Sequence, residues 1–333
     1  MHTIRHMDIP ETESLGELDL AIVHALQIDA RAPWTKIATT VGADAATVAR
    51  HWQAMSEESL AWLTAWPTPE RWSTTTDVAM VLLDRGAGDE VIERIAGMPW
   101  TLGIDDTSAG FLVLVAASSG LAVLGDRVRE LEEAGAAVLR MDVAASIAAE
   151  DSSWRLAVLS RSQQRVMRQR RDDDGSRAPR PEVVAEVAEA LDDDPRMPAA
   201  TLARALGVSE ATARRTVDRS IAAGLLRLGC DLAMPAAGYR RGAVLWARAD
   251  DVDDAAVRAQ HTAQTHRVGV LVGPAPLFVC VRARTLTALT GIERDWGEGI
   301  EVVDRWTVLR GIKRNGHLLD AAGRTRGRVP LAW

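Results

Sequence analysis

Threonine and arginine side chains recur at helical spacing after Gly207, and both residue types can contact nucleic acid. Arginine binds a guanine edge through two hydrogen bonds or neutralises a phosphate, and threonine does either more weakly. Positions three and four residues apart share one face of a helix. The residues that this segment could offer to DNA are Ser209, Thr212, Arg214, Arg215, Thr216 and Arg219.

Three short helices are needed to position these side chains. The pattern predicts helices over Pro181–Leu191, Ala199–Leu206 and Glu210 to about Ala222. Gly207 would end the second helix in a left-handed conformation, and Ser209 would cap the third. A helix, a tight glycine turn and a capped helix suit the DNA major groove. The alternative is a three-helix packing module with a solvated arginine face.

The same unit occurs earlier in the chain, which indicates an internal duplication. Shifting the sequence by 165 residues places Ala25–Arg50 on Ala190–Arg215, and ten of those 26 positions are identical. The first copy has fewer side chains suited to DNA, since Ala54 stands where the second copy has Arg219. Its core is expected to be larger, because Trp52 replaces Val217. Its candidate DNA contacts are Lys36, Thr47, Arg50 and His51.

A strand-rich stretch follows each helical unit. Both stretches read β-α-β-β-α-β, which is the ferredoxin-like order. The fold class expected is α+β, with two winged-type helix-turn-helix domains alternating with two βαββαβ domains. The boundaries expected are 15–66 and 181–228 for the helical domains, 74–159 and 239–322 for the βαββαβ domains, 160–180 for a linker and 323–333 for a basic tail.

Composition and motifs exclude several classes of protein. The sequence holds no GxGxxG, GxxxxGK[ST], GxSxG or HExxH motif, so we expect no enzyme, no catalytic residues and no cofactor. Cys230 and Cys280 are the only cysteines, and no cysteine–histidine spacing suits a metal. The absence of a long apolar run and of a secretory signal predicts a cytoplasmic protein without a membrane partner. The net charge of −7 argues mildly against DNA binding, although segregated charge weakens that argument.

These motifs resemble those of the Lrp/AsnC family of bacterial and archaeal transcriptional regulators. Leu18–Leu26 is similar to the opening helix of that family, and Gly207–Arg219 and Gly42–Arg50 are similar to its recognition helix. The resemblance implies two family protomers fused in tandem, each pairing a helix-turn-helix with a βαββαβ effector (RAM) domain. It also implies a sequence-specific regulator that binds double-stranded DNA, responds to a small molecule such as an amino acid, and forms dimers or tetramers.

The chain departs from the family pattern at three turns. Gly224 matches the usual glycine after the recognition helix, whereas Ser59 does not. Neither effector-domain turn, at 106–111 and 273–278, keeps the aspartate of amino-acid-responsive members. These turns argue against a response to an amino acid. The acidic net charge and the weak reading surface of the first copy leave an alternative function, which is an effector-binding or assembly protein that has lost much of its DNA binding.

The duplication also predicts how the two halves of the chain pack together. We expect the two βαββαβ sheets to pack face to face and to bury Val113, Val115, Val279 and Val281 between them. We also expect the second helix-turn-helix to dominate DNA binding, because it has more arginines on its outer face.

Overall fold

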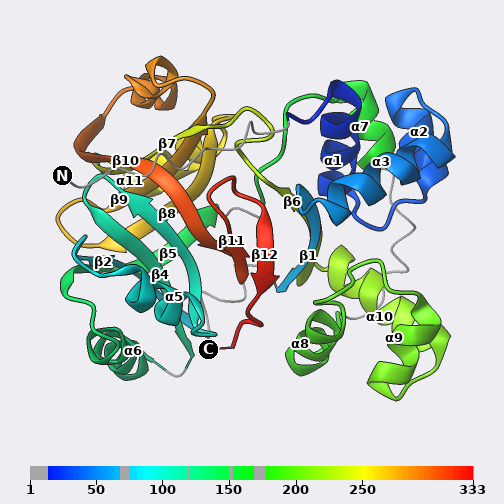
Figure 1. Ribbon diagram of the computed structural model, residues 1–333, viewed down its shortest axis with the longest axis horizontal. Helices are drawn as coiled ribbons and strands as arrows, with labels where there is room; N and C mark the ends of the chain where they lie inside the picture. The colour runs from blue at the N-terminus through cyan, green and yellow to red at the C-terminus, as the bar shows by residue number, and fades with distance from the viewer. Residues whose placement is uncertain (1–13, 68–75, 119, 150–152, 169–177, 333) are drawn as a thin grey trace, which may run out of the picture.

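The computed structural model describes residues 14–67, 76–118, 120–149, 153–168 and 178–332 (Figure 1). Two groups of three helices lie on one side of the molecule, and a large antiparallel sheet lies on the other. None of the helices within these ranges is long and apolar enough to cross a membrane.

The first triplet comprises α1 (Glu17–Ile28), α2 (Trp34–Val41) and α3 (Ala45–Glu57). Gly42 ends α2 with a φ of 75°, a conformation that costs glycine little, and the Asp44 side chain caps α3 by accepting from the amide of Thr47. The segment expected as a linker contains another helix, α7 (Arg161–Arg168). This helix packs against α1 and α2, so it belongs structurally to the first triplet.

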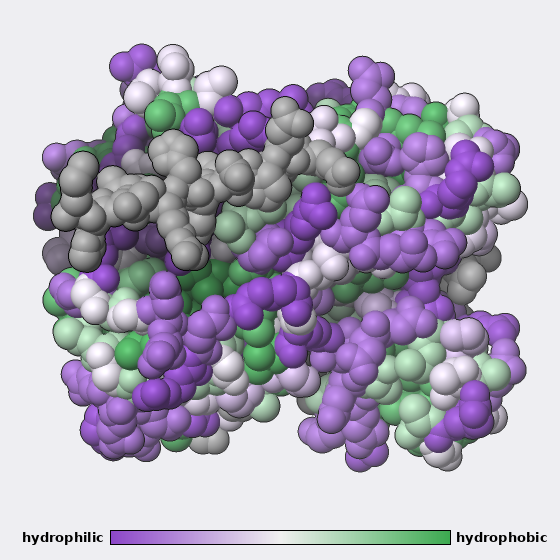
Figure 2. Space-filling view, in the orientation of Figure 1, coloured by the Kyte–Doolittle hydropathy of each residue, from purple (hydrophilic) through white to green (hydrophobic). Residues whose placement is uncertain are grey.

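The second triplet comprises α8 (Pro181–Ala190), α9 (Ala199–Leu206) and α10 (Glu210–Ala222). It repeats the geometry of the first, because Gly207 ends α9 with a φ of 65° and the Ser209 hydroxyl accepts from the amide of Thr212 at 3.2 Å. Ala213 and Val217 of α10 are buried, which leaves Arg214 and Arg215 of that helix on the outer side. On the face shown in Figure 2, the surface is indented between this triplet and the sheet.

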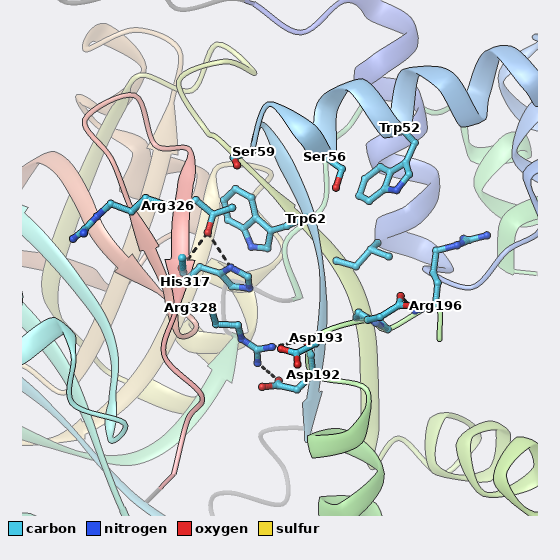
Figure 3. A pocket seen from close by; sticks show the side chains of 15 residues that line it. Trp52, Ser56, Ser59, Trp62, Asp192, Asp193, Arg196, His317, Arg326 and Arg328 are labelled. Carbon is cyan, nitrogen blue, oxygen red and sulfur yellow. Dashed lines mark hydrogen bonds and ion pairs between the residues drawn. The ribbon is translucent and has the colours of Figure 1, made fainter. Parts of the chain in front are cut away.

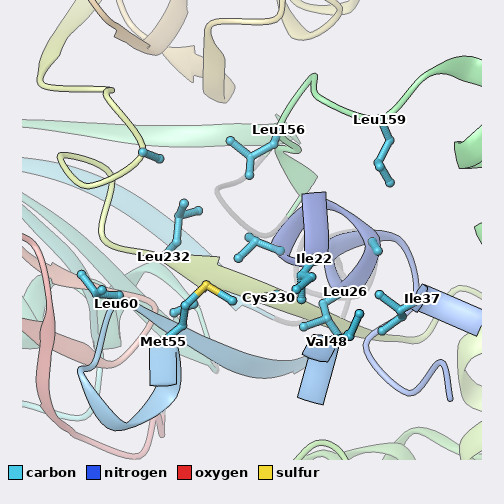
Figure 4. Close-up of a cluster of buried hydrophobic side chains, with 14 of the residues drawn as sticks. Ile22, Leu26, Ile37, Val48, Met55, Leu60, Leu156, Leu159, Cys230 and Leu232 are labelled. Atoms are coloured by element: carbon cyan, nitrogen blue, oxygen red, sulfur yellow. The ribbon is translucent and has the colours of Figure 1, made fainter. Parts of the chain in front are cut away.

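The two triplets are joined by a two-stranded ribbon whose strands each pack against both triplets. Strand β1 (Ala61–Pro67) follows the first triplet, and β6 (Leu226–Leu232) follows the second; they pair antiparallel along their full lengths. Cys230 and Leu232 of β6 pack into the core of the first triplet beside Ile22 (Figure 4). Ala65 of β1 packs into the core of the second triplet. Each core is therefore completed by a strand from the other half of the chain.

The remaining strands form two halves of one sheet. The first half contains β2 (Thr76–Leu83), β3 (Thr101–Thr107), β4 (Gly110–Ser118) and β5 (Val138–Ala149), with α5 (Asp89–Ala96) and α6 (Leu121–Glu133) on its outer face. The second half contains β7 (Arg241–Ala249), β8 (Thr265–Val272), β9 (Leu277–Ala283) and β10 (Ile300–Arg314), covered by α11 (Val252–Gln260) and two 3₁₀ turns, η2 (Thr287–Leu289) and η3 (Ile292–Trp296). Both halves have the ferredoxin-like strand order. In the second half, the two 3₁₀ turns stand where the β-α-β-β-α-β order predicts the second helix.

The halves join edge to edge and close into a barrel. β5 pairs with β8, β10 pairs with β3, and β10 also pairs with β7, so that eight of the ten strands in the sheet form a ring. The expected face-to-face packing is therefore wrong. Val113 and Val279 face the covering helices, and their neighbours Leu112 and Phe278 fill the barrel. Successive side chains of a strand point to opposite faces of the sheet. The residues that meet the other half of the chain are therefore the immediate neighbours of the expected ones.

A buried ion cluster also crosses between the two halves inside the barrel. The carboxylate of Asp105 on β3 accepts from Arg267 Nη2 of β8 at 3.0 Å and from Arg282 Nη2 of β9 at 2.7 Å. All three side chains are nearly inaccessible to solvent. The acid comes from the first half and both bases from the second.

A short hairpin extends the sheet beyond β10. It consists of β11 (His317–Leu319) and β12 (Thr325–Arg328), and its first turn contains Asn315 and Gly316, both with positive φ. Such a turn favours asparagine and glycine, which is why this pair predicts a hairpin from the sequence. Part of the expected basic tail is thus a strand of the sheet.

Candidate functional site

A pocket of about 630 Å³ lies where the two triplets meet the C-terminal hairpin (Figure 3). Three segments that are far apart in the sequence line it. Trp52, Ser56, Ser59, Trp62 and Leu63 come from the end of α3 and from β1; residues 192–196 come from the loop between α8 and α9; and His317 and residues 325–328 come from the hairpin. The pocket exists only when all three segments are assembled.

Three aromatic rings form one part of a wall that is otherwise mostly polar and charged. The Trp62 indole packs against the His317 ring with 5.2 Å between centroids and a tilt of 35°. Trp52 reaches the pocket from the other side, from α3 (Figure 3). Trp62 is only 7% exposed, and within the described part of the chain its Nε1 has no hydrogen-bond partner. A buried indole N–H that is still unsatisfied favours a ligand with an acceptor.

His317 is held in one orientation and without charge. Its Nδ1 lies 3.2 Å from the hydroxyl oxygen of Thr325 on the neighbouring strand. Burial, and secondly the positive charge of Arg314, lower the pKa of His317 from 6.5 to about 4. At neutral pH the imidazole is therefore uncharged, and one ring nitrogen has a free lone pair.

Charged groups at the base of the pocket fasten the hairpin to its surroundings. Arg328 binds both the carboxylate and the main-chain carbonyl of Asp192 in the α8–α9 loop, and burial lowers the pKa of Arg328 to about 10, which keeps it charged at neutral pH. Arg326 extends away from the pocket and binds Glu93 of α5 at 2.6 Å. The hairpin thereby connects the first half of the sheet with the second triplet.

The expected DNA-contacting residues of the first triplet divide into two groups. Thr47 and Arg50 lie on the outer side of α3, with 3.5 Å between Arg50 Nη2 and Thr47 Oγ1. Lys36 and His51 have partners within the fold instead. Lys36 Nζ donates to the carbonyl of Met167 in α7 at 2.9 Å, and His51 Nδ1 lies 2.7 Å from Asp19 Oδ1.

The second triplet leaves more of its expected contacts exposed. Arg214 and Arg215 are exposed on α10; Arg214 pairs with Glu210 at 2.8 Å, and Arg215 Nη2 lies 3.5 Å from Thr212 Oγ1. Thr216 donates to the main chain of its own helix at Thr212, and Arg219 is half-buried. Ser209 serves as the helix cap, so its hydroxyl already forms hydrogen bonds with the main chain and side chain of Thr212.

Sequence reasoning did not find the pocket residues Trp62, His317 and Arg328. It placed Trp52 in the core, and this side chain does pack against the core of the first triplet besides lining the pocket. A signal was present, because the chain has eleven tryptophans against one tyrosine and two phenylalanines. The asparagine–glycine turn also places His317 at the start of a strand. No sequence pattern showed that the three segments lining the pocket lie next to one another. Among the residues described, no group of three or more histidine, cysteine, aspartate or glutamate side chains could hold a bare metal ion.

Residues 15–56 match the AsnC-type helix-turn-helix domain, so the first triplet is a domain of that type. A comparison with curated protein sequences found no match.

Solved structures with the same fold over most of the chain include the siroheme decarboxylase NirDL, with 13% sequence identity, a TM-score of 0.54, and coverage of 90% of this chain and 93% of that one. The same enzyme in complex with an iron-uroporphyrin III analogue matches with a TM-score of 0.53 at 13% identity over the same shares of both chains. Escherichia coli AsnC matches over 39% of this chain and 91% of its own, with 22% identity and a TM-score of 0.33.

The expectation that this chain is not an enzyme is contradicted by the likeness to NirDL. The tandem architecture, which the sequence associates with regulators, is also the architecture of a decarboxylase. The absence of common catalytic motifs could not exclude this class, because those motifs belong to other folds.

Proposed function

We propose that this chain binds an iron tetrapyrrole in the interdomain pocket and acts on it as a decarboxylase of the siroheme decarboxylase type. The observation that carries the proposal is the position of Trp52. This residue belongs to α3, the helix that would read DNA in a helix-turn-helix, yet it lines the pocket together with Trp62 and His317. Aromatic rings around a cavity suit a flat macrocycle, which they contact through their faces.

The size and polar groups of the pocket support this ligand class. Its 630 Å³ lie within the range of roughly 300–1,000 Å³ that is usual for small-molecule sites. Carboxylate substituents would find donors in the hydroxyls of Ser56 and Ser59 and an attractive positive charge in Arg328. The negative charge of Asp192 is offset by Arg328, while Asp193 and Asp194 are exposed and favour orientations that keep carboxylates away from them.

The internal contacts of the first triplet support a role in ligand binding over a role in reading bases. α7 packs on α1 and α2, and Lys36 and His51 are tied to Met167 and Asp19. Decarboxylation of an acetate substituent breaks the bond to its carboxyl carbon, releases carbon dioxide and adds a proton to the remaining carbon. A pocket that removes water from the carboxylate favours loss of that charge.

The first test is binding of iron uroporphyrin III to the full chain, followed by the Soret band and by quenching of tryptophan fluorescence. Trp52→Ala should weaken binding about tenfold or more, a loss of about 1.4 kcal/mol. Gln53→Ala is the matched control, because Gln53 is the next residue on α3, is exposed and does not line the pocket. Absence of binding, or equal losses in both variants, would overturn this assignment of the pocket.

The second test is the reaction. Siroheme incubated with the chain in the absence of oxygen should lose carbon dioxide. Mass spectrometry should then detect products that have lost one or two molecules of carbon dioxide. A chain that binds the tetrapyrrole and returns it unchanged would remove the enzymatic part of the proposal and leave the binding part.

A second candidate function is regulation of transcription, and the exposed face of α10 favours it. We infer for this candidate that the second triplet is a helix-turn-helix whose Arg214 and Arg215 contact DNA, with the pocket as the site of a small-molecule effector. Gel-shift experiments with genomic fragments, with and without the tetrapyrrole, test this function. Uniform weak binding to all fragments would argue against it.

A further inference from the structure

His317 has the geometry of a metal ligand prepared by its neighbours. It stands on β11 directly after the Asn315–Gly316 turn, with its ring against Trp62 and its Nδ1 beside the Thr325 hydroxyl. Histidines that bind metals characteristically use one ring nitrogen for the metal and the other for an orienting hydrogen bond. Since Nδ1 faces Thr325, Nε2 is the nitrogen available to a ligand in the pocket.

We infer that His317 binds, through Nε2, the iron of a macrocycle in the interdomain pocket as an axial ligand. This inference rests on the proposed function, because it assigns the metal recognition of that same site. It also narrows the ligand class, since a metallated macrocycle would be preferred to the same macrocycle without metal.

The residues around His317 suit a metal that is already held in a macrocycle and not a bare ion. No cluster of three or more ligating side chains is present in the described ranges, so a bare ion would find too few partners here. One histidine is sufficient for iron in a macrocycle, because the four ring nitrogens supply the other ligands and the protein supplies an axial position.

The restraint on the His317 side chain supports the inference. The residue is 9% exposed, and its ring lies between Trp62 and Thr325. Little rotamer freedom is left to lose when the iron binds.

The test compares ferric iron uroporphyrin III with metal-free uroporphyrin III, which carries the same carboxylates. The wild-type chain should shift the Soret band and the electron paramagnetic resonance signal of the iron compound toward a histidine-ligated form. His317→Ala should lose this signature and bind the iron compound about tenfold more weakly. Its affinity for the metal-free compound should stay within about twofold of wild type, and added imidazole should restore the signature.

His261→Ala is the matched control, since His261 is exposed at the end of α11, away from the pocket lining. Thr325→Val keeps the imidazole but removes the hydroxyl beside Nδ1, so it should weaken the signature even if His317→Ala folds poorly. Iron uroporphyrin that binds to His317→Ala with an unchanged spectrum would overturn the axial ligand and leave the proposed function standing. Failure of both compounds to bind to the wild-type chain would overturn both.

Discussion

Ser59 is a residue whose backbone conformation conflicts with its side chain. It follows α3 with a φ of 57°, whereas Gly224 holds the corresponding place after α10 with a φ of 66°. A left-handed conformation costs a residue with a Cβ about 1–2 kcal/mol relative to glycine. The sequence comparison identified Ser59 as the position where the usual glycine is missing, and the structure supplies the physical consequence.

Exchanging the two residue types should therefore change stability in opposite directions. Ser59→Gly should raise the free energy of unfolding by about 1 kcal/mol, and Gly224→Ala should lower it by a similar amount. The Gly224 variant isolates backbone strain, because an added Cβ there would meet nothing within 4 Å. Urea titration of the full chain measures both, and a stabilised Gly224→Ala would contradict the argument.

Lys313 is a base buried inside the protein, at 1% exposure. Its Nζ donates to the carbonyl of Met98 at 2.8 Å and to the hydroxyl of Thr101 at 3.0 Å, and burial lowers its pKa from 10.5 to about 7. Between those two values the unfolded chain binds a proton that the folded chain does not. The free energy of unfolding should therefore rise with pH above about 7, by at most about 1.4 kcal/mol per pH unit, and be insensitive to this group below it.

Lys313→Met provides the comparison for this pH dependence. The stability of the wild type relative to this variant should increase from pH 7 to pH 9 in denaturant titrations. A difference that is constant with pH would mean that Lys313 remains protonated in the folded protein over that range.

At the level of helices and strands, local sequence signals predicted most of the structure. Gly207, Ser209 and the asparagine–glycine turn each act on their immediate neighbours, so their effects can be read without knowing the rest of the fold. Local signals do not predict which face of a strand packs against the other half of the chain. Val113 and Leu112 are both apolar, and only the closure of the barrel decides which of them points inward.

The two candidate recognition helices permit a direct comparison. Arg50 and Arg215 each lie 3.5 Å from a threonine hydroxyl one turn earlier, but Arg214 adds a second exposed arginine to α10 where α3 has Ala49. If the chain binds DNA, Arg215→Ala should weaken specific binding more than Arg50→Ala, by about 1–3 kcal/mol for a base contact.

Fluorescence anisotropy with a selected fragment measures this difference, with Arg129→Ala on α6 as a control away from both triplets. Each phosphate contact should also contribute a slope of about −0.9 to log K against log salt concentration. Equal losses for the two helix variants would show that the helices contribute equally, and affinity independent of salt would argue that these arginines do not meet phosphate.

For the whole molecule, the pairing of the two halves depends on the cluster of Asp105, Arg267 and Arg282. Asp105→Asn would leave two buried guanidinium groups without that carboxylate charge, which should cost about 3–5 kcal/mol. Replacing all three with apolar residues, as in Asp105→Leu, Arg267→Leu and Arg282→Met combined, should recover most of the loss, because this cluster would then contain no buried charge.

Thermal and urea unfolding of the full chain measure both variants. Asp126→Asn is the control, because its ion pair with Arg129 on α6 is exposed and should contribute less than about 1 kcal/mol. A small effect of Asp105→Asn would mean that water reaches the cluster. This contact between the halves could not be predicted from the sequence, because the three residues lie 162 and 177 positions apart.

The pairing of β1 with β6 has a consequence for how the chain folds as it is made. The core of the first triplet lacks Cys230, Leu232 and Met234 until the ribosome has added about 170 residues beyond α3. At about 5–20 residues per second, that interval is on the order of ten seconds. During it, the apolar side of α1 that later meets β6 stays uncovered, so the nascent chain should depend on chaperones that shield such surfaces more than a chain whose helix-turn-helix closes on its own strand.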